Sequence, residues 1–388
     1  MRESLSPGLD VSVFEGVLAV GDEDARATLA RQLAALVCDS ASPEIEIQQV
    51  QPILLKLTVD PSEPVRLIMA EELAGAANLD VDVAFSIMAD DDTIALPFLA
   101  KTQSLQASHF IAILKVGDEA RAKVIAARPD IMAEVADHII RAGSLPAALA
   151  LCDNRSIVLE PNDCHALYLR FGGSREMVEL LLAKPDLPLD IRIIQARRTA
   201  SRMRQLMAEK GWIAANDASE LCAEAEDNAL MQVLIEASPA ERATATAFMA
   251  AKNMLTPALI VRAAATGQMS VVESALAHLT GNSQPRTAGL MYAAAPAQLK
   301  SLFRRSGLPQ ACFGILRAAC DVVIDMREEG IDLNAVEFGG RILEALMTRY
   351  DMLTSNERAK QIEYLGRYGE MKIRKVARQL KADLVRAA

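Results

Sequence analysis

The feature that most constrains this fold is a weak internal repeat of helix-length segments, spaced by about 40 to 50 residues along the chain. Residues 22–33 (DEDARATLARQL) align with residues 62–73 (SEPVRLIMAEEL), so that Arg26 matches Arg66. A third acidic start followed by arginine lies at 118–121 (DEAR), and residues 83–99 are echoed at 135–151. Self-similarity at this spacing is typical of helical hairpins, which bury their apolar faces by stacking on their neighbours.

Several segments show the apolar spacing of amphipathic helices. The segment 62–76 begins with Ser62 as a possible cap and Pro64 in the first turn, and it then carries one apolar stripe. The stripe consists of Val65, Met69, Leu73 and Ala76. Residues 189–207 repeat apolar side chains in the same way, ending at Met203 and Met207.

Parts of this sequence resemble a known repeat type and a known protein family. The stretch DPSEPVR (60–66) is similar to the inter-helix turn and second-helix start of HEAT repeats. The segments 89–114, 120–143 and 255–281, the last continuing into 302–319, resemble an alphaproteobacterial helical family, the domain of unknown function 2336. The likeness extends over most of residues 20–325. This resemblance implies a helical, HEAT-like fold and assigns no catalytic residue.

The chain is therefore predicted to be all-α, with HEAT-like helical-hairpin repeats (an α-solenoid) and a C-terminal helical bundle. The composition agrees, because a chain that is 51% hydrophobic and only 4% aromatic favours helix over sheet. We expect N-terminal repeats over 1–210, a second helical repeat block over 211–330 and a C-terminal helical extension over 331–388.

Within the last two segments, three shorter stretches carry specific predictions. The apolar run 308–326 would coat more than half of a helix, which favours the centre of a bundle and, second, a subunit interface. Residues 328–334 read as a linker. Two final helices are expected near Ala335–Tyr350 and Asn356–Asp383, with Gly366 and Gly369 weakening the second.

Charge is distributed unevenly along the chain. The net charge is -10, and residues 1–100 carry 18 acidic and 5 basic side chains. An acidic front half makes nucleic acid an unfavourable partner, because binding to the phosphate backbone needs a groove lined by Lys and Arg. Residues 367–388 are basic and could touch a membrane or an acidic protein, although packing against the preceding helix is favoured.

Hydropathy and cysteine usage indicate where in the cell the protein is expected. The longest stretches without a charged residue, such as 102–114, have 13 residues. A membrane-spanning helix needs about 20 apolar residues, so no transmembrane segment is expected. The N-terminus lacks the pattern of a secretory signal. Six scattered cysteines without a CxxC motif predict free thiols and a cytoplasmic location.

Motifs that would indicate catalysis or a cofactor are absent from the sequence. There is no P-loop, GxGxxG, HExxH or GxSxG pattern, so we expect a non-enzymatic protein without a cofactor. The cluster Asp163-Cys164-His165, with Cys152 upstream, has the wrong spacing for zinc, and no metal site is expected. It reads instead as a helix start, capped by Asn162 or Asp163, with Leu167 and Leu169 entering the core.

Two charged clusters remain. Asp90, Asp91 and Asp92 are predicted to form an acidic cap on a helix over 93–101, through the helix dipole, rather than a metal or acid–base site. The arginines of residues 192–204 are the candidate partner-binding group, facing a phosphorylated or acidic partner, or else a solvated face with ion pairs to acidic neighbours. They are Arg192, Arg197, Arg198, Arg202 and Arg204.

These features predict a non-enzymatic repeat protein that acts as a protein–protein interaction scaffold or as a bacterial signalling regulator. Its partner would be a protein, with a homo-oligomer possible, and repeat proteins present long continuous surfaces for such docking. The alternative is a HEAT-like nucleic-acid-binding protein or an enzyme of the DNA glycosylase type, which would need stacking partners for a flipped base.

Overall fold

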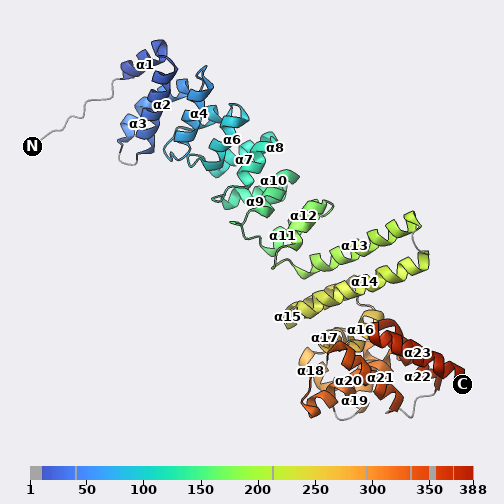
Figure 1. The fold of residues 1–388 in the computed structure, drawn as a ribbon. Coiled ribbons are helices and arrows are strands. Elements are labelled where there is room, and N and C mark those ends of the chain that lie inside the picture. Colours follow the sequence, from blue (N-terminus) through green and yellow to red (C-terminus); the bar gives the residue numbers. More distant parts are fainter. Residues whose placement is uncertain are drawn as a thin grey trace, which may run out of the picture. The chain divides into compact units, whose positions relative to one another are not determined.

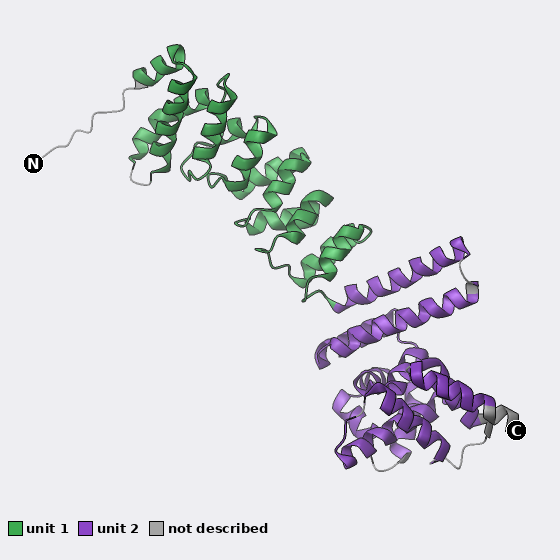
Figure 2. Ribbon diagram, viewed as in Figure 1, with its two compact units in different colours: residues 1–188 green, residues 189–388 purple. Residues whose placement is uncertain are grey.

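The computed structural model describes residues 11–39, 42–211, 214–293, 296–332, 334–348, 355–369 and 371–387. Within these ranges the chain forms 23 α-helices and one 3₁₀-helix, and no β-strand. The all-α prediction is therefore confirmed for the described residues. The chain divides into two compact units, residues 1–188 and residues 189–388 (Figure 2).

The first unit is a succession of short helices, most of them 8 to 11 residues long (Figure 1). They are α1 (Val11–Val20), α2 (Glu23–Cys38), α3 (Glu44–Leu57), α4 (Glu63–Leu73), α5 (Val81–Met88), α6 (Asp92–Lys101), α7 (Ala107–Val116), α8 (Glu119–Ala126), α9 (Ala133–Ala142), α10 (Leu145–Asp153), α11 (Pro161–Phe171) and α12 (Arg175–Leu182).

These helices pack in two rows. In one row α2, α4, α6, α8, α10 and α12 each contact the next. In the other, α1 contacts α3, α3 contacts α5, α7 contacts α9 and α9 contacts α11. Contacts between successive helices, such as α2 with α3 and α11 with α12, join the rows. This is the contact pattern expected of stacked helical hairpins; the more specific assignment to the HEAT class stays a prediction.

The apolar stripes predicted from the sequence form the interior of the first unit. Val65, Met69 and Leu73 of α4 have no exposed surface, and Ala76 is also buried. Each short helix buries one such stripe between its neighbours in the row. Because 8- to 11-residue helices are marginal on their own, burial against neighbouring helices supplies most of their stability.

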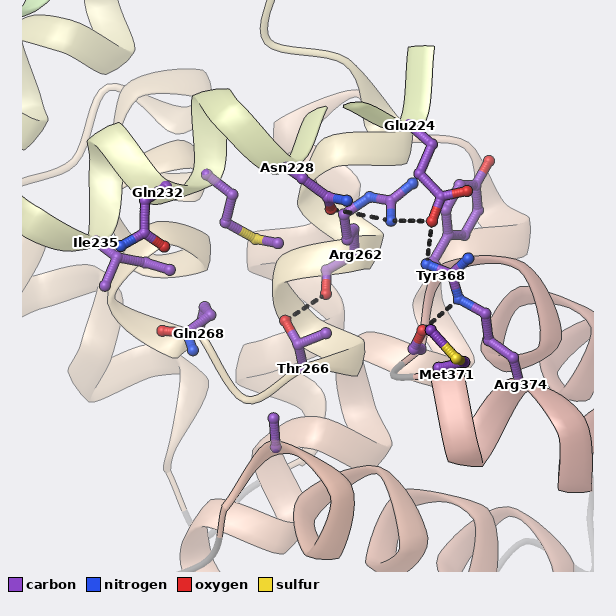
Figure 3. Close-up of a pocket in the computed structure, with 13 residues that line it drawn as sticks. Glu224, Asn228, Gln232, Ile235, Arg262, Thr266, Gln268, Tyr368, Met371 and Arg374 are labelled. Atoms are coloured by element: carbon purple, nitrogen blue, oxygen red, sulfur yellow. Dashed lines mark hydrogen bonds and ion pairs between the residues drawn. The ribbon is translucent and has the colours of Figure 1, made fainter. Parts of the chain in front are cut away.

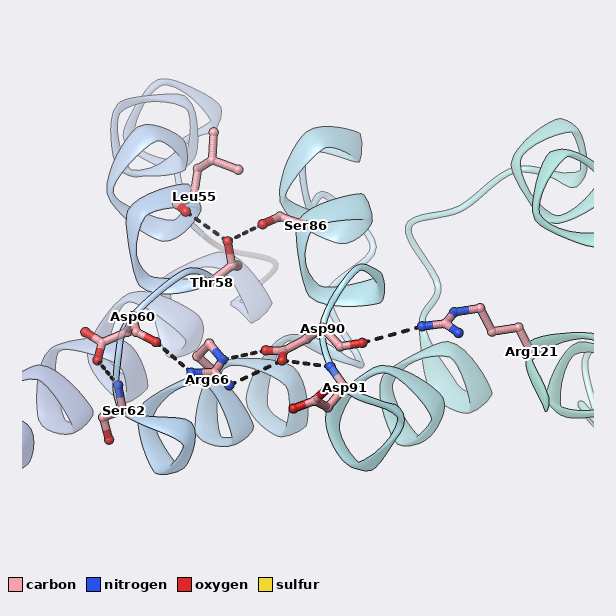
Figure 4. Close-up of polar contacts among 9 residues, drawn as sticks. All are labelled: Leu55, Thr58, Asp60, Ser62, Arg66, Ser86, Asp90, Asp91 and Arg121. Carbon is pink, nitrogen blue, oxygen red and sulfur yellow. Dashed lines mark hydrogen bonds and ion pairs between the residues drawn. The ribbon is translucent and has the colours of Figure 1, made fainter. Parts of the chain in front are cut away.

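The aligned arginines of the internal repeat occupy equivalent positions. Arg26 donates from Nε to Asp60 at 2.7 Å and from Nη1 to the Gly21 carbonyl. Arg66 donates from Nε to Asp90 at 2.6 Å and from Nη1 to the Asp60 carbonyl (Figure 4). Each arginine thus joins the turn before its own helix to the turn before the next helix of the row, which explains why the sequence repeats here.

The third copy of the motif continues this chain of contacts. Arg121 donates from Nη1 to Asp92 and Asp118, and from Nη2 to the Met88 carbonyl oxygen. Its Nη2 also donates to the Asp90 carbonyl oxygen (Figure 4). The prediction that Asp90 to Asp92 form an acidic cap is confirmed for Asp91 and for Asp92, which lies in the first turn of α6, and needs correction for Asp90. Asp91 is the N-cap residue of α6, whereas Asp90 accepts from Arg66 and Asp92 from Arg121.

Further along the first unit, side chains bind the free carbonyls at helix ends. Arg128, which is 5% exposed, donates to the carbonyls of Leu99 and Thr102 at the end of α6. Asn154 donates to the Ala126 and Arg128 carbonyls, and Arg170 donates to the last carbonyls of α9. The final C=O groups of a helix lack intrahelical partners, so these bonds satisfy them and also join neighbouring hairpins.

The second unit contains two 22-residue helices followed by shorter ones (Figure 1). They are α13 (Leu189–Lys210), α14 (Ala215–Glu236), α15 (Pro239–Ala251), α16 (Pro257–Ala265), α17 (Met269–Thr280), α18 (Gln284–Met291), α19 (Pro296–Ser306), a 3₁₀-helix η1 (Gln310–Cys312), α20 (Phe313–Glu329), α21 (Ala335–Thr348), α22 (Ser355–Tyr368) and α23 (Met371–Ala387).

One continuous core holds this unit together, with α20 at its centre. Helix α20 contacts α16, α19, α21 and α22, and Leu316, Ala319 and Cys320 are buried in the core. The prediction that residues 308–326 belong to a bundle core is therefore confirmed. Gly314 permits a close approach, because a Cβ there would lie 2.7 Å from the Gln361 side chain.

The C-terminal prediction needs one correction. The single helix expected over 356–383 is two helices, α22 and α23, which pack on one another as a hairpin. The chain turns at Gly369, where a Cβ would lie 2.8 Å from the Leu365 carbonyl oxygen. After this turn Ala377 is buried, whereas Val376 is 49% exposed. Residues 349 and 350 of the other predicted helix lie outside the described ranges.

The boundary expected at 210/211 falls at the turn of a helical hairpin. Helices α13 and α14 pack against one another along their lengths, and both belong to the second unit. The linker expected over 328–334 agrees with the end of α20 at Glu329, where Gly330 adopts a φ of 67°. The other boundaries of the three predicted segments stay predictions.

Candidate functional site

The first unit has an apolar groove on α8, α10 and α12. It has a volume of about 960 Å³. Its apolar lining comes from all three helices and consists of Val124, Ala127, Leu145, Pro146, Leu149, Ala150 and Leu180. Apart from exposed Ala127, these side chains are half-buried, so each keeps apolar surface in contact with solvent. An apolar surface shared by three neighbouring helices is a candidate docking site.

The charged rim of the groove is mostly acidic. Asp153, Glu176 and Glu179 line it together with one basic residue, Lys123, and all four are exposed. Glu179 also accepts from Arg175 at 2.7 Å, an exposed pair one helical turn apart. The groove therefore offers apolar contact at its floor and negative charge at its edge.

The apolar composition of α10 indicates this groove from the sequence, although it forms no recognisable motif. Helix α10 (LPAALALCD) has a single charged residue, Asp153, at its end. Its buried face is formed by Ala147, Ala148, Leu151 and Cys152, so the remaining apolar residues must face outward. A helix that is apolar all round is either central or covers a binding surface.

A second candidate is a mixed-charge pocket of about 410 Å³ within the second unit. Arg262 of α16 is 4% exposed and lies 3.5 Å from Glu224 and 3.7 Å from Asp227, both of α14. Its guanidinium also faces the Tyr368 ring, 5.5 Å from the centroid. Arg374 of α23 contacts Glu224 from the other side (Figure 3).

The pKa values of the two carboxylates that face Arg262 are shifted in opposite directions. The hydrogen bond from Arg374 lowers the pKa of Glu224 and outweighs its burial. Burial raises the pKa of Asp227, since its nearest arginine atom is 3.7 Å away and two glutamates lie close. Ion pairs therefore join α14 to three other helices: Asp227 to Arg262 of α16, Glu220 to Arg367 of α22, and Glu224 to Arg374 of α23.

The arginines predicted to bind a partner lie on one helix, α13, but do not form one patch. Arg197 donates to the Lys252 carbonyl, and Arg204 lies 3.9 Å from Glu226 of α14. Arg198 and Arg202 are exposed, and Arg192 is half-buried. Their role in partner binding stays a prediction.

The cluster at Asp163 to His165 is a helix start, as expected, and Asp163 takes part in its capping box, although the N-cap position is held by Glu160. The N-cap residue of α11 is Glu160, whose backbone N–H donates to the Asp163 carboxylate at 3.0 Å. Cys164 is buried, and His165 contacts the Pro161 carbonyl within its own helix. Leu167 is buried, but Leu169, expected in the core, is 86% exposed.

No group of three or more His, Cys, Asp or Glu side chains is arranged to hold a metal ion in the described ranges. None of the described helices is both long enough and apolar enough to span a bilayer.

The structure defines an all-α protein that has rows of paired helices and a groove with an acidic rim. Residues 94–355 match the model of a family described as an uncharacterised protein conserved in bacteria (DUF2336). The match covers more than half of the chain, which therefore belongs to this family. No curated protein and no solved structure shows significant similarity to it.

The resemblance read from residues 89–114, 120–143 and 255–281 is thereby confirmed, since these segments lie almost wholly within the matched range. The matched range includes α8, α10 and α12, and so the whole groove.

Proposed function

We propose that the protein is a non-enzymatic interaction protein of the bacterial cytoplasm, acting as a scaffold or a signalling regulator. Its groove on α8, α10 and α12 binds a basic amphipathic helix of a protein partner. The observation that carries this proposal is the apolar floor with its acidic rim. The six free cysteines support the location, because thiols stay reduced in the cytoplasm.

The apolar floor supports a helix as the bound element. Amphipathic helices lay one apolar face into grooves of this kind, with anchors spaced by three or four residues. Leu145, Leu149 and Leu180 keep partly exposed surface that such a face would cover. Each Å² of apolar surface removed from water contributes about 25 cal/mol.

The rim supports a basic partner. Three carboxylates against one ammonium group leave a negative edge, and the acidic excess of residues 1–100 adds to this field. Complementary charge at the edge of an interface raises the association rate and rejects partners of the same sign. The same charge disfavours nucleic acid, so that alternative gains no support from this groove.

The test uses a defined probe and the full chain. The probe is a fluorescent synthetic helix with leucines along one face and lysines at its flanks, and its comparison is the same peptide with glutamates at the flanks. We expect the lysine peptide to bind and the glutamate peptide to bind at least about tenfold more weakly. Added salt should reduce this difference, because exposed charges are screened.

Substitutions locate the binding on the groove. Leu149→Glu should abolish binding, while Leu169→Glu, at an exposed leucine of α11, should leave it unchanged. Replacing Glu176 and Glu179 by lysine should reverse the preference between the two peptides. Equal binding of the lysine peptide by the Leu149→Glu and Leu169→Glu variants, or no binding by the unaltered chain, would exclude this groove. Duplex DNA that displaces the peptide would favour the nucleic-acid alternative instead.

A further inference from the structure

The hairpin of α13 and α14 has an unusual separation of charge. Helix α13 carries six basic and two acidic side chains, whereas α14 carries six acidic and none basic. The two helices lie side by side and run in opposite directions (Figure 1). The hairpin therefore presents a positive helix next to a negative one along its whole length.

The half of this hairpin nearest its turn buries little apolar surface within one chain. Its α14 part is held by ion pairs of Glu220 with Arg367 and of Glu224 with Arg374. No residue of α13 from Ser201 to Lys210 is buried. In the facing part of α14, from Asn216 to Ala229, only Ala218 and Cys222 are buried, and both are small. Two helical segments that bury so little against each other are marginal in water.

Exposed apolar side chains lie on this same half. Met203, Leu206 and Leu221 are 42%, 38% and 53% exposed. Each residue of a helix turns by about 100°. Met203 therefore lies to one side of the Ala200 face that packs on α14, and Leu221 lies to one side of the Ala218 face. Because the two helices are antiparallel, both side chains point to the same side of the hairpin.

We propose that two copies of the chain associate through this side of the α13–α14 hairpin, forming a four-helix bundle about a two-fold axis parallel to the helices. A two-fold axis brings the same surface of each copy together, so the surface must complement itself. This axis sets α13 of one copy against α14 of its partner copy, and a basic helix thereby meets an acidic one on both sides of the bundle.

The register of the contact follows from the antiparallel hairpin. Lys210 and Asp217 lie on either side of the turn and on the same side of the hairpin as the apolar residues. In the dimer the Lys210 ammonium of one copy reaches the Asp217 carboxylate of the other. One turn or two further along, Met203 and Leu206 cover Leu221 of the facing helix, as core residues do in four-helix bundles.

The first experiment measures mass in solution. We expect sedimentation equilibrium of the full chain to show a concentration-dependent dimer. Combining Met203→Glu with Leu221→Glu should shift the chain to the monomer mass. The matched control combines Val158→Glu with Leu169→Glu, at residues that are 83% and 86% exposed in the first unit, and should remain dimeric. Circular dichroism checks that each variant keeps its helix content.

Charge exchange tests the register. Lys210→Glu and Asp217→Lys should each raise the dimer dissociation constant about tenfold, and the double exchange should restore it. An ion pair confined to one hairpin would change the melting temperature without changing the mass.

A crosslink keeps the proposal testable if the glutamate variants misfold. In a background carrying Cys38→Ser, the one exposed cysteine is removed. A Met203→Cys chain mixed with a tagged Leu221→Cys chain should form a disulfide between the two chains on mild oxidation. The proposal fails if the unaltered chain is a monomer at all concentrations and salt levels. It also fails if a dimer forms but ignores every one of these substitutions.

Discussion

Polar contacts hold the helices together in both units, but the contacting residues are separated by different distances along the sequence. In the first unit, Arg66 binds Asp90 across 24 residues and Arg121 binds the Met88 carbonyl across 33. In the second, Gln361 binds the Ala311 carbonyl across 50 residues, and Arg367 pairs with Glu220 across 147. The first unit is therefore held by nearest neighbours along the chain, whereas the second needs distant segments to meet.

This difference predicts how each unit responds to damage. In an array of stacked repeats, stability is a sum of local terms, so a lost contact loosens its own neighbourhood. In a single core that joins residues from Ile193 to Ala377, a lost contact weakens the whole unit. Long-range contacts of this kind also slow folding, because loops must close before the contacts form.

The largest effect is expected from core truncation, one variant in each unit. Leu99→Ala in α6 and Ile342→Ala in α21 remove side chains with no exposed surface, at a cost of about 2–5 kcal/mol each. Amide hydrogen exchange followed by mass spectrometry should show faster exchange around α4, α6 and α8 for Leu99→Ala. For Ile342→Ala it should show faster exchange throughout residues 189–388. Uniform acceleration in both variants would remove the distinction between the units.

A smaller effect is expected from replacing Gln361 or Arg128, two buried polar side chains that hydrogen-bond the backbone of a neighbouring segment. We call these two side chains the buried polar clamps. Gln361 is 5% exposed; it accepts from the Ile315 N–H at 3.0 Å and donates to the Ala311 carbonyl at 2.8 Å. Gln361→Met should cost about 1–3 kcal/mol, because both backbone groups are left without a partner. Arg128→Met should cost a similar amount in the first unit, where it frees the carbonyls of Leu99 and Thr102.

The control for both clamp variants is Arg175→Ala. Its ion pair with Glu179 is exposed, with 89% of the arginine side chain accessible, so its loss should cost under about 0.5 kcal/mol. Urea unfolding gives the free energies, and hydrogen exchange assigns them to a unit. A clamp variant no more destabilised than this control would mean that water replaces the lost bonds at that position.

Sequence patterns predicted the regular part of the fold because its interactions are local. The alignment of Arg26 with Arg66 reflects equivalent ion pairs, to Asp60 and Asp90. The stripe of Val65, Met69 and Leu73 is buried as its spacing required. The family resemblance indicated the helical class and pointed to no site.

The candidate site and the C-terminal turn were harder to predict for physical reasons. The groove is made by side chains of three helices, and no single helix contains it as a motif. The break between α22 and α23 lies at Gly369, where a Cβ would lie 2.8 Å from the Leu365 carbonyl oxygen. Met203 keeps the spacing of a core residue yet is 42% exposed, because the described residues of its own chain leave that side of α13 partly uncovered.

The smallest effects are expected from two aspartates with opposite dependence on pH. Burial alone would raise the pKa of Asp90, but the bonds from Arg66 and from the Asp91 N–H hold it below its usual value. The Asp90 ion pair thus stabilises the first unit above the unfolded-state pKa of about 3.9, and this is lost as pH falls through the folded value. At neutral pH, Asp90→Asn should cost about 1 kcal/mol or less.

The pKa of Asp227 is shifted in the opposite direction from that of Asp90, so its effect on stability has the opposite dependence on pH. Burial raises its pKa above the unfolded value, so its ionised form destabilises the second unit once pH has risen through the folded pKa. Below about pH 3.9 the group is protonated in both states and the penalty is absent. Asp227→Asn should therefore stabilise residues 189–388 at neutral pH and have no effect in acid, measured by hydrogen exchange at both pH values. If it destabilises the unit at neutral pH, the attraction to Arg262 outweighs burial, and this contact is a true fastener like those of the first unit.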